Sequence, residues 1–381
     1  MKKNRITGLL AALFVLGIPS GFAQVKVTVK NPSPFDRLEE AVVIPLSGLS
    51  SKIQLKNGET YVVEDAQGKS VISQVTSDRN LIFLTQLKSG EKAVYAISNG
   101  HEVKADSRAY GKYHPERKDD FCWENDKVGF RVYGKSLIAV DGPSNGIDLW
   151  FKRTNRLVVD EWYEKDRKLG TSFHIDHGEG MDAFAVGRSL GAGAMAPFVN
   201  DTLWLNKNYE TYQLLDNGPL RVRLRVTYNA LNVAGKSYKE SREFVLDAGS
   251  NFTKVIQAYE GADKNMKVAA GILKHENDST IATPHYLIYK EPTDPSFKDI
   301  YVAVIFPFNK INKVVNTYTT DVKGTAKTFS HTLAVTNYSQ PSVYFTGFGW
   351  SKSTFPTVAD FHRYVELFKI QAQHPLKVTV K

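Results

Sequence analysis

The sequence has a single cysteine, Cys122, among 381 residues. One cysteine excludes an internal disulfide and a zinc site built from several thiolates. The sequence also lacks a P-loop, a Gly-x-Ser-x-Gly nucleophile elbow, a His-Glu-x-x-His zinc motif and the glycine fingerprint that binds dinucleotides. These absences argue against nucleotide chemistry. Beyond residue 23, no apolar run reaches the roughly 18 to 20 residues that a membrane-spanning helix needs, so we expect no membrane anchor.

The composition is that of a folded protein. It includes 5 Trp, 18 Tyr and 21 Phe, which is too aromatic for a disordered chain. With 42% hydrophobic and 23% charged residues, a chain of this length should form one large β domain or two domains. The net charge is +9, but the basic residues are spread along the chain, so we expect no nucleic-acid partner.

Residues 1–23 have the pattern of a secretory signal peptide. Two lysines and an arginine precede the apolar run 9–18, and 21–23 offer small residues for cleavage. Cleavage after residue 23 would leave 381 − 23 = 358 residues and a net charge of +9 − 3 = +6. We therefore expect the protein to be exported, with the periplasm of a Gram-negative bacterium as its destination. We also expect a monomer or a small homo-oligomer.

The period of the apolar residues predicts mainly β structure. Alternation is clear at 25–30 and 94–97, and glycine-containing turns separate such segments, which is typical of antiparallel sheets. A change in composition predicts a small N-terminal β domain over 24–105 and a larger domain over 106–381. Only one helix is predicted, near the end of the chain, where apolar residues recur at helical spacing before Pro375, namely Val358, Phe361, Val365, Phe368 and Ala372.

The segment 113–126 combines charged and aromatic residues. Seven of its fourteen residues are charged and three are aromatic. An aromatic ring stacks on the face of a sugar while charged groups bind its hydroxyls, so we predict that Arg117, Trp123 and Glu124 bind substrate. The alternative is a solvated loop that leads into a strand at 128–133. Asp119 and Asp120 have the character of turn or capping residues.

The segment 173–182 holds two histidines and three carboxylates, and its glycines predict a loop. A histidine beside a carboxylate is suited to proton transfer near neutral pH. We therefore predict His174 or His177 as catalytic base and acid, with Glu179 or Asp176 orienting the imidazole. A divalent metal and a purely structural role stay open as alternatives, although His-x-x-His matches no strong ligand spacing.

Two further positions add to the candidate site. Arg188 follows the histidine segment and is predicted, like Arg117, to neutralise an acidic group through its guanidinium. Trp350 lies among glycines and could stack on a sugar.

These segments resemble the DUF4861 family of exported bacterial proteins associated with polysaccharide utilisation. The resemblance covers nearly all of the predicted mature chain, and the stretches that carry it are 116–126, 146–154, 174–187, 217–221 and 349–352. The run Gly191-Ala192-Gly193 departs from the Gly-Cys-Gly-like pattern expected there, but a turn of small residues remains. The motif Lys152-Arg153-Thr154 adds Arg153 to the predicted substrate-binding residues.

The resemblance implies a small β-sandwich-like domain followed by a large antiparallel supersandwich, similar to galactose mutarotase-like and polysaccharide lyase domains. It also implies activity on uronic-acid oligosaccharides, including dehydration to a 4,5-unsaturated uronate. Such a reaction needs a cation for the carboxylate, a base for the C5 proton and an acid for the C4 oxygen, and it needs no cofactor.

Three rival functions remain open. A polysaccharide lyase would expel a sugar in place of water. A glycoside hydrolase would use two carboxylates, for which Glu116, Glu124 and Glu179 are candidates. A non-catalytic module would bind glycans on a platform of Trp123, Trp150 and Trp350.

Overall fold

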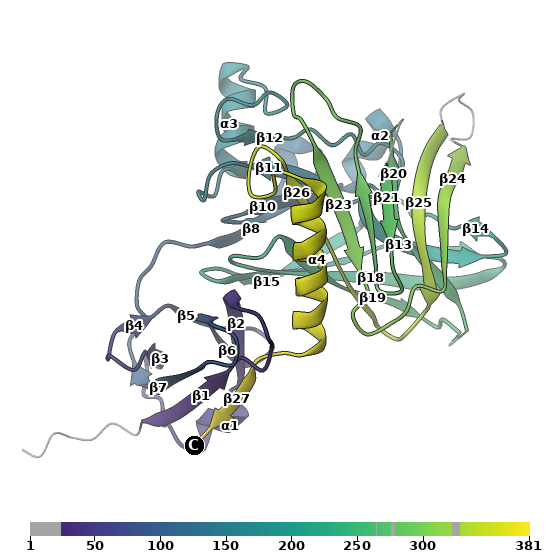
Figure 1. Cartoon of the computed structure of the whole chain (residues 1–381). Coiled ribbons are helices and arrows are strands. Elements are labelled where there is room, and N and C mark those ends of the chain that lie inside the picture. Colours follow the sequence, from purple (N-terminus) through teal and green to yellow (C-terminus); the bar gives the residue numbers. More distant parts are fainter. Residues whose placement is uncertain (1–23, 264, 276–278, 322–327) are drawn as a thin grey trace, which may run out of the picture.

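The computed structural model describes residues 24–263, 265–275, 279–321 and 328–381 (Figure 1). The predicted signal peptide lies outside the described residues. Antiparallel sheets dominate, with a long helix near the C-terminus, so the predicted mainly β fold is confirmed. None of the helices in the described part of the chain is long and apolar enough to cross a bilayer.

The N-terminal region consists of two small sheets with their own core. One sheet has the order β27-β1-β7-β3-β4 and the other β2-β6-β5. Alternation in the sequence produces this core: Val25, Val27 and Val29 of β1 are all buried. The elements are β1 (Val25–Lys30), β2 (Arg37–Pro45), α1 (Ser47–Ser50), β3 (Thr60–Glu64), β4 (Ser70–Val71), β5 (Ser73–Val75), β6 (Asn80–Leu87), β7 (Lys92–Gly100) and the C-terminal β27 (Lys377–Val380).

A five-stranded sheet with the order β12-β11-β10-β9-β8, the β8–β12 sheet, begins the larger region. Its elements, with the helices that follow or interrupt them, are β8 (Ala109–His114), the 3-10 helix η1 (Pro115–Arg117), β9 (Asp120–Asn125), β10 (Val128–Val132), the 3-10 helix η2 (Lys135–Leu137), α2 (Ile138–Asp141), β11 (Asp148–Lys152), α3 (Val159–Leu169) and β12 (Gly180–Met181).

Two more sheets complete the sandwich. The second has the order β14-β13-β20-β25-β24, and the large sheet has the order β15-β16-β18-β19-β26-β23-β22-β21, with β17 paired to β18. Their strands are β13 (Ala192–Val199), β14 (Thr202–Leu203), β15 (Thr211–Asn217), β16 (Arg221–Thr227), β17 (Leu231–Val233), β18 (Lys236–Asp247), β19 (Phe252–Glu260), β20 (Lys267–Lys274), β21 (Ser279–Ala282), β22 (Tyr286–Lys290), β23 (Ile300–Ile305), β24 (Lys313–Asp321), β25 (Thr328–Asn337) and β26 (Ser342–Trp350).

The inner face of the large sheet packs against both other sheets. Trp123 of β9 stacks on Phe244 of β18 with ring centroids 4.5 Å apart, and Phe151 of β11 meets Phe348 of β26 at 4.7 Å. On the other side of the core, the Thr346 hydroxyl of β26 donates to the carbonyl oxygen of Ala192 in β13. One continuous apolar core therefore joins the three sheets.

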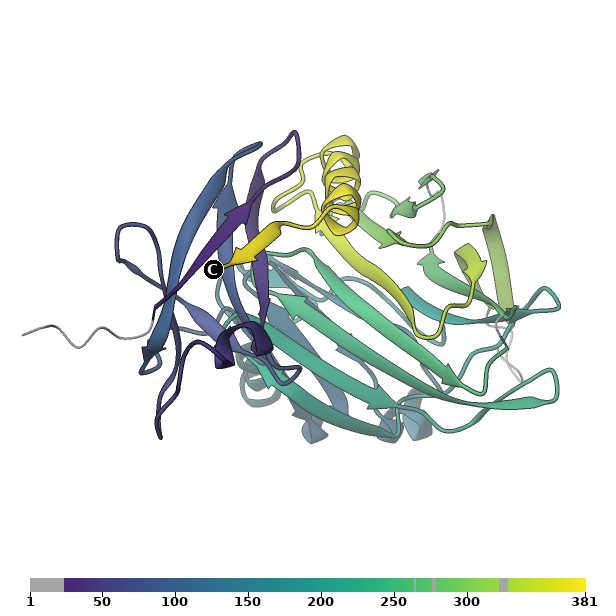
Figure 2. The same ribbon diagram turned by 90° about the horizontal axis from the view of Figure 1, so that it is seen from below.

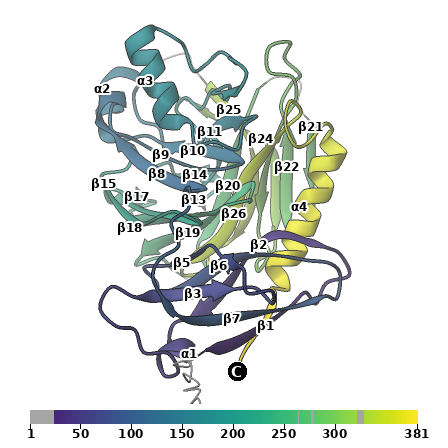
Figure 3. The ribbon, with the colours of Figure 1, turned by 90° about the vertical axis from the view of Figure 1, so that its left-hand side faces the viewer.

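Helix α4 (Val358–Gln373) covers the outer face of the large sheet, as Figures 2 and 3 show. It begins with a capping box in which Thr357 and Asp360 bind each other's backbone, and it buries Phe361 and Val365. The sequence prediction of this helix is confirmed. After α4 the chain returns to the N-terminal region, where β27 pairs with β1.

The chain between β7 and β8, residues 101–108, links the N-terminal sheets to the rest of the molecule. The predicted division at residue 105 stays a prediction. The structure adds that the C-terminal strand β27 lies in the N-terminal sheet, so both regions contain residues from the last part of the chain.

The outer face of the β8–β12 sheet positions the candidate site. Alternation along β9 points Phe121 and Trp123 into the core, so Asp120 and Glu124 point outward. Helix α3 and the loop before β12 cover this outer face through Trp162, Phe173 and their neighbours. Figure 3 shows α2 and α3 at the end of the molecule farthest from the N-terminal sheets.

Candidate functional site

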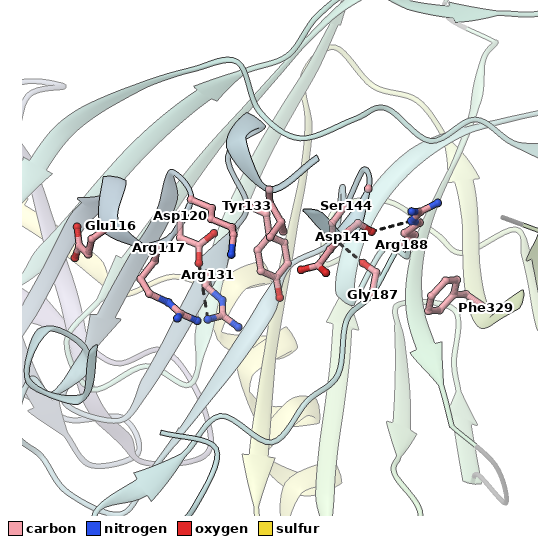
Figure 4. Close-up of a pocket in the computed structure, with 13 residues that line it drawn as sticks. Glu116, Arg117, Asp120, Arg131, Tyr133, Asp141, Ser144, Gly187, Arg188 and Phe329 are labelled. Carbon is pink, nitrogen blue, oxygen red and sulfur yellow. Dashed lines mark hydrogen bonds and ion pairs between the residues drawn. The ribbon is translucent and has the colours of Figure 1, made fainter. Parts of the chain in front are cut away.

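Two neighbouring cavities lie on this side of the molecule. The first, here called the arginine cavity, has a volume of about 460 Å³ and is shown in Figure 4. It is lined by Glu116, Arg117, Lys118, Asp120, Arg131, Tyr133, Leu137, Asp141, Gly142, Ser144, Gly187, Arg188 and Phe329. In Figure 4, Tyr133 lies between the Arg117–Arg131 end of this cavity and Arg188.

The second, here called the histidine cavity, has a volume of about 650 Å³. It is lined by Arg131, Tyr133, His174, Ile175, Asp176, Met181, Asp182, Ala183, Phe184, Ala185, Val186, Ser296, Phe297 and Lys352. Arg131 and Tyr133 line both cavities, so these two side chains form a shared wall. A ligand at that wall can contact groups from both cavities.

Arg131 is the centre of a buried ionic cluster. Its Nη2 donates to Asp148 and, at 2.7 Å, to Oδ2 of Asp182, while its Nη1 lies 3.9 Å from Oδ2 of Asp120. The Tyr133 hydroxyl donates to Asp148 at 2.7 Å. One guanidinium thus faces three carboxyl groups, and all four residues of this charged set are at most 6% exposed.

Strand register explains why these residues meet. Arg131 of β10 is directly opposite Asp148 of β11 on one side and Cys122 of β9 on the other. Opposite residues in adjacent strands point to the same face, and Asp120 follows two positions from Cys122 on that face. Asp182 directly follows β12, and β12 pairs with the C-terminal end of β11.

Burial changes the acidity of these carboxyl groups. Burial, together with the Asp148 carboxylate, raises the pKa of Asp182 to about 8 against the opposing effect of Arg131. Burial also raises the pKa of Asp120 to about 6, although Arg131 and Arg117 favour its charged form. The cluster therefore retains a carboxyl proton at neutral pH.

His174 has the geometry of a base. Its Nδ1 lies 3.0 Å from the backbone carbonyl oxygen of Asp182, which can only accept a hydrogen bond, so Nδ1 carries the proton. The lone pair is then on Nε2, and the side chain is 59% exposed in the wall of the histidine cavity. The same ring approaches Asp182 Oδ2 at 3.7 Å from Nδ1. Of the two predicted histidines, His174 is the one placed to take a proton from a ligand.

Of the other predicted members of this loop, His177 and Glu179 line neither cavity. His177 Nε2 is 3.1 Å from the carbonyl oxygen of Ser172, and Glu179 forms an ion pair with Arg156 at 2.6 Å. Arg153 Nη2 lies 3.3 Å from Asp176, which also binds Lys352 at 3.1 Å. Of these residues, only Asp176 and Lys352 line the histidine cavity. The orienting group for His174 is the Asp182 carbonyl, not Glu179 or Asp176.

Arg117 and Arg188 both line the arginine cavity, as a role in binding an acidic group requires. The Arg117 guanidinium lies over the Phe173 ring at 4.9 Å and over the Tyr163 ring at 5.2 Å. Arg188 donates from Nε to the carbonyl oxygen of Asp141 at 2.9 Å, and no ion pair between described residues involves it. Gly142, with φ +77°, lets this guanidinium lie against the backbone, where a Cβ would collide with it.

Two residues predicted to bind substrate are buried instead. Trp123 is 1% exposed, stacks between Phe130 and Phe244, and belongs to the sandwich core. Glu124, also 1% exposed, forms an ion pair with Lys152 at 2.6 Å and accepts the N–H groups at the start of α3. A substrate cannot reach either side chain, so the structure replaces both predicted roles with structural ones.

The predicted tryptophan platform is also wrong. Trp350 is 2% exposed, and its Nε1 donates to the carbonyl oxygen of Phe297 at 2.5 Å. Trp150 is fully buried between Trp162 and Phe173. Together with the burial of Trp123, this removes the flat aromatic surface on which the binding-module hypothesis depended.

The structure also bears on the metal and hydrolase alternatives. Among the described residues, no group of three or more His, Cys, Asp or Glu side chains is arranged to hold a metal ion. Of the glutamates considered for a hydrolase, Glu116 lines a cavity, whereas Glu124 and Glu179 are engaged in the ion pairs described above.

Sequence reasoning missed the Arg131 cluster. Asp120, expected in a turn, begins strand β9, while Asp119, with φ +67°, does occupy a turn. The signal was present as polar residues alternating with buried aromatic ones in 120–125, and as charged residues within the apolar runs 128–132 and 148–152. The pairing of these three runs cannot be read from alternation alone, because it depends on register.

Comparisons with known proteins agree with this architecture. The family model described as "Domain of unknown function (DUF4861)" matches residues 29–378. The Uncharacterized protein P7 of Formosa agariphila is 29% identical over 379 residues, which cover 93% of each chain. A solved structure of a protein in the glycosyl hydrolase family 38 from Enterococcus faecalis aligns with a TM-score of 0.50 and 11% identity. That alignment covers 96% of this chain and 48% of the other, so this chain spans about half the length of that structure, and the likeness concerns the fold alone.

Proposed function

The chain belongs to the DUF4861 family, and from this premise we propose that it is a carbohydrate-active lyase that dehydrates uronic-acid oligosaccharides. The reaction removes the C5 proton and the C4 hydroxyl of a terminal uronate and leaves a 4,5-unsaturated sugar. An exported protein would meet such acidic oligosaccharides outside the cytoplasm.

The observation that carries this proposal is the placement of His174. Its Nδ1 proton is held by the Asp182 carbonyl, which leaves Nε2 as the acceptor in a cavity whose wall includes Arg131 and Lys352. A base beside cations is what the abstraction of a proton next to a carboxylate requires, because the cation stabilises the negative charge that develops.

The arginine cavity supplies the cation for the uronate carboxylate. Arg117 and Arg188 line it, and Arg131 belongs to the wall that it shares with the histidine cavity. A uronate at this wall would direct its carboxylate toward the guanidinium groups and its C5–H bond toward His174. Charge-assisted hydrogen bonds from a guanidinium match the two oxygens of a carboxylate.

The test is to incubate the purified protein with a panel of uronate-terminated oligosaccharides and to follow ultraviolet absorbance and product mass together. A rise in absorbance with the loss of one water and unchanged chain length is expected. A rise with shorter chains would make the protein a polysaccharide lyase, with a sugar as leaving group. Neither change on any uronate would contradict the proposal.

A glycoside hydrolase is the second candidate, because two carboxyl groups with a raised pKa line the two neighbouring cavities, Asp120 the arginine cavity and Asp182 the histidine cavity. Hydrolysis needs one carboxyl as an acid and another as base or nucleophile. Asp120 and Asp182 would take these roles, in place of the glutamates expected from the sequence. Shorter chains without a rise in absorbance would favour this function.

A further inference from the structure

We propose that Asp182 is the acid that protonates the leaving C4 oxygen, an inference that rests on the proposed elimination. Asp182 is 3% exposed and lines the histidine cavity together with His174. Its Oδ2 accepts a hydrogen bond from Arg131 at 2.7 Å and lies 3.7 Å from His174 Nδ1. Acid and base therefore lie in one cavity, held by adjacent parts of one loop.

The other carboxyl groups of the cluster are less suited to this role. Asp148 is fully buried, lines neither cavity, and accepts hydrogen bonds from Arg131 and the Tyr133 hydroxyl. Asp120 lines the arginine cavity and not the histidine cavity. Only Asp182 shares a cavity wall with the base.

The surroundings of Asp182 favour its protonated form. The charged groups that face it are Arg131 from β10, Asp148 from β11, Arg117 from η1 and His174 from its own loop. Burial and the Asp148 carboxylate outweigh the two arginines and raise its pKa above neutrality. A carboxylic acid that keeps its proton at neutral pH can donate it to a poor leaving group.

Unsatisfied polar atoms in the same cluster are an independent sign of a ligand site. Asp120 Oδ1 and Arg131 Nε are buried without a hydrogen-bond partner, and both residues line the arginine cavity. Asp120 is itself 4% exposed. Buried polar atoms are usually paired, so atoms left unpaired at a cavity wall indicate partners supplied from the cavity.

His174 Nε2 takes the C5 proton, and the C5–H electron pair moves into an enolate of the uronate carboxyl group, stabilised by the guanidinium groups. The pair then forms the C4=C5 bond, and the C4–O bond breaks as the Asp182 proton passes to the departing oxygen. The products are the unsaturated uronate and water. The enzyme is left with a charged imidazolium and a carboxylate; the exposed His174 then releases its proton to solvent, and Asp182 takes one up.

The experiment compares the wild-type protein with Asp182→Asn on two substrates and in deuterated water. Asparagine keeps the shape of a neutral carboxylic acid but cannot supply its proton. One substrate carries the natural 4-hydroxyl, and the other carries fluoride at C4, which leaves without protonation. His177→Ala serves as the matched control, because His177 is in the same loop but outside both cavities.

We expect Asp182→Asn to lose roughly 100-fold in turnover of the hydroxyl substrate, the size typical of a missing general acid. Elimination of fluoride and exchange of the C5 proton with deuterium should stay close to the wild-type rates. Equal losses on both substrates, or loss of exchange, would overturn the inference, because Asp182 would then act only through His174. Unchanged turnover of the hydroxyl substrate would also overturn it.

Failure of the proposed function has a different signature: the wild-type protein would neither exchange the C5 proton nor eliminate either group. If Asp182→Asn does not fold, the inference is tested by the pH dependence of the wild-type rate on the two substrates. Elimination of the hydroxyl should fall at alkaline pH, where Asp182 ionises, whereas elimination of fluoride should not. Parallel profiles for the two substrates would contradict the inference.

Discussion

Two buried arginines in this protein have opposite surroundings. Arg242, in the middle of β18, is fully buried and forms an ion pair with Glu240 at 2.7 Å. It also donates to the Asn145 carbonyl oxygen at 2.9 Å, while Gln257 donates to the same Glu240 at 2.8 Å. Arg131, in the middle of β10, faces three carboxyl groups and borders two cavities.

The comparison separates a structural use of buried charge from a chemical one. At Arg242, one cation and one carboxylate balance each other's charge inside the core. Arg131, even with Arg117 nearby, cannot balance the charge of three carboxyl groups, so a proton stays in the cluster beside the two cavities. We take this imbalance, more than burial as such, as the mark of the functional site.

The largest effect is expected from Arg242→Met, which leaves Glu240 buried without its cation. Breaking a buried ion pair costs about 3–5 kcal/mol of folding free energy. Chemical denaturation should show this loss, while turnover per folded molecule stays unchanged. A loss of activity without a loss of stability would erase the distinction between the two arginines.

A smaller effect is expected from Arg188→Gln in the arginine cavity. Removing a charge-assisted contact to the uronate carboxylate should cost about 1.5–3 kcal/mol, or roughly 10- to 100-fold in kcat/KM. Arg153→Gln is the matched control, since Arg153 pairs with Asp176 and lines neither cavity. Equal losses in the two variants would show that Arg188 does not bind the carboxylate.

The smallest effect concerns stability and pH. The folded-state pKa of Asp182 is raised from its ordinary value of 3.8 to about 8, so its contribution to stability is greatest below pH 4 and is lost as the pH rises through 8. Asp182→Asn never ionises, and it should melt above the wild type at pH 9, with the difference vanishing at pH 4. The gain should be about 1 kcal/mol, because the variant also weakens the pairing of Arg131. A variant that is less stable than the wild type at pH 9 would contradict the assigned charge state.

Much of the fold was predictable because alternation and helical spacing are local signals. The run 25–30 alternates and forms β1, and the apolar spacing after residue 357 forms α4. The predicted division at residue 105 stays a prediction, and no local pattern shows that β27 would return to pair with β1.

The site was predictable only in part. His174, Arg117 and Arg188 line the cavities. Their segments could be recognised in the sequence because they carry the charged residues and glycines expected of loops. Trp123 was misread because composition does not reveal which residues of a strand face the core, and Glu124 because it does not reveal that α3 covers the outer face of the sheet. Asp148 and Arg131 were not identified because they meet through strand register, which the sequence of one chain does not display.

The most direct test of the account compares His174→Ala with His177→Ala on a uronate substrate that the wild type converts. The two histidines are three residues apart in one loop, but only His174 lines a cavity. We predict that His174→Ala loses roughly 100- to 10,000-fold in turnover, the range for a missing general base, while His177→Ala keeps nearly all of it. Full activity in His174→Ala, or an equal loss in both variants, would contradict the claim that the cavity beside Arg131 carries out the chemistry.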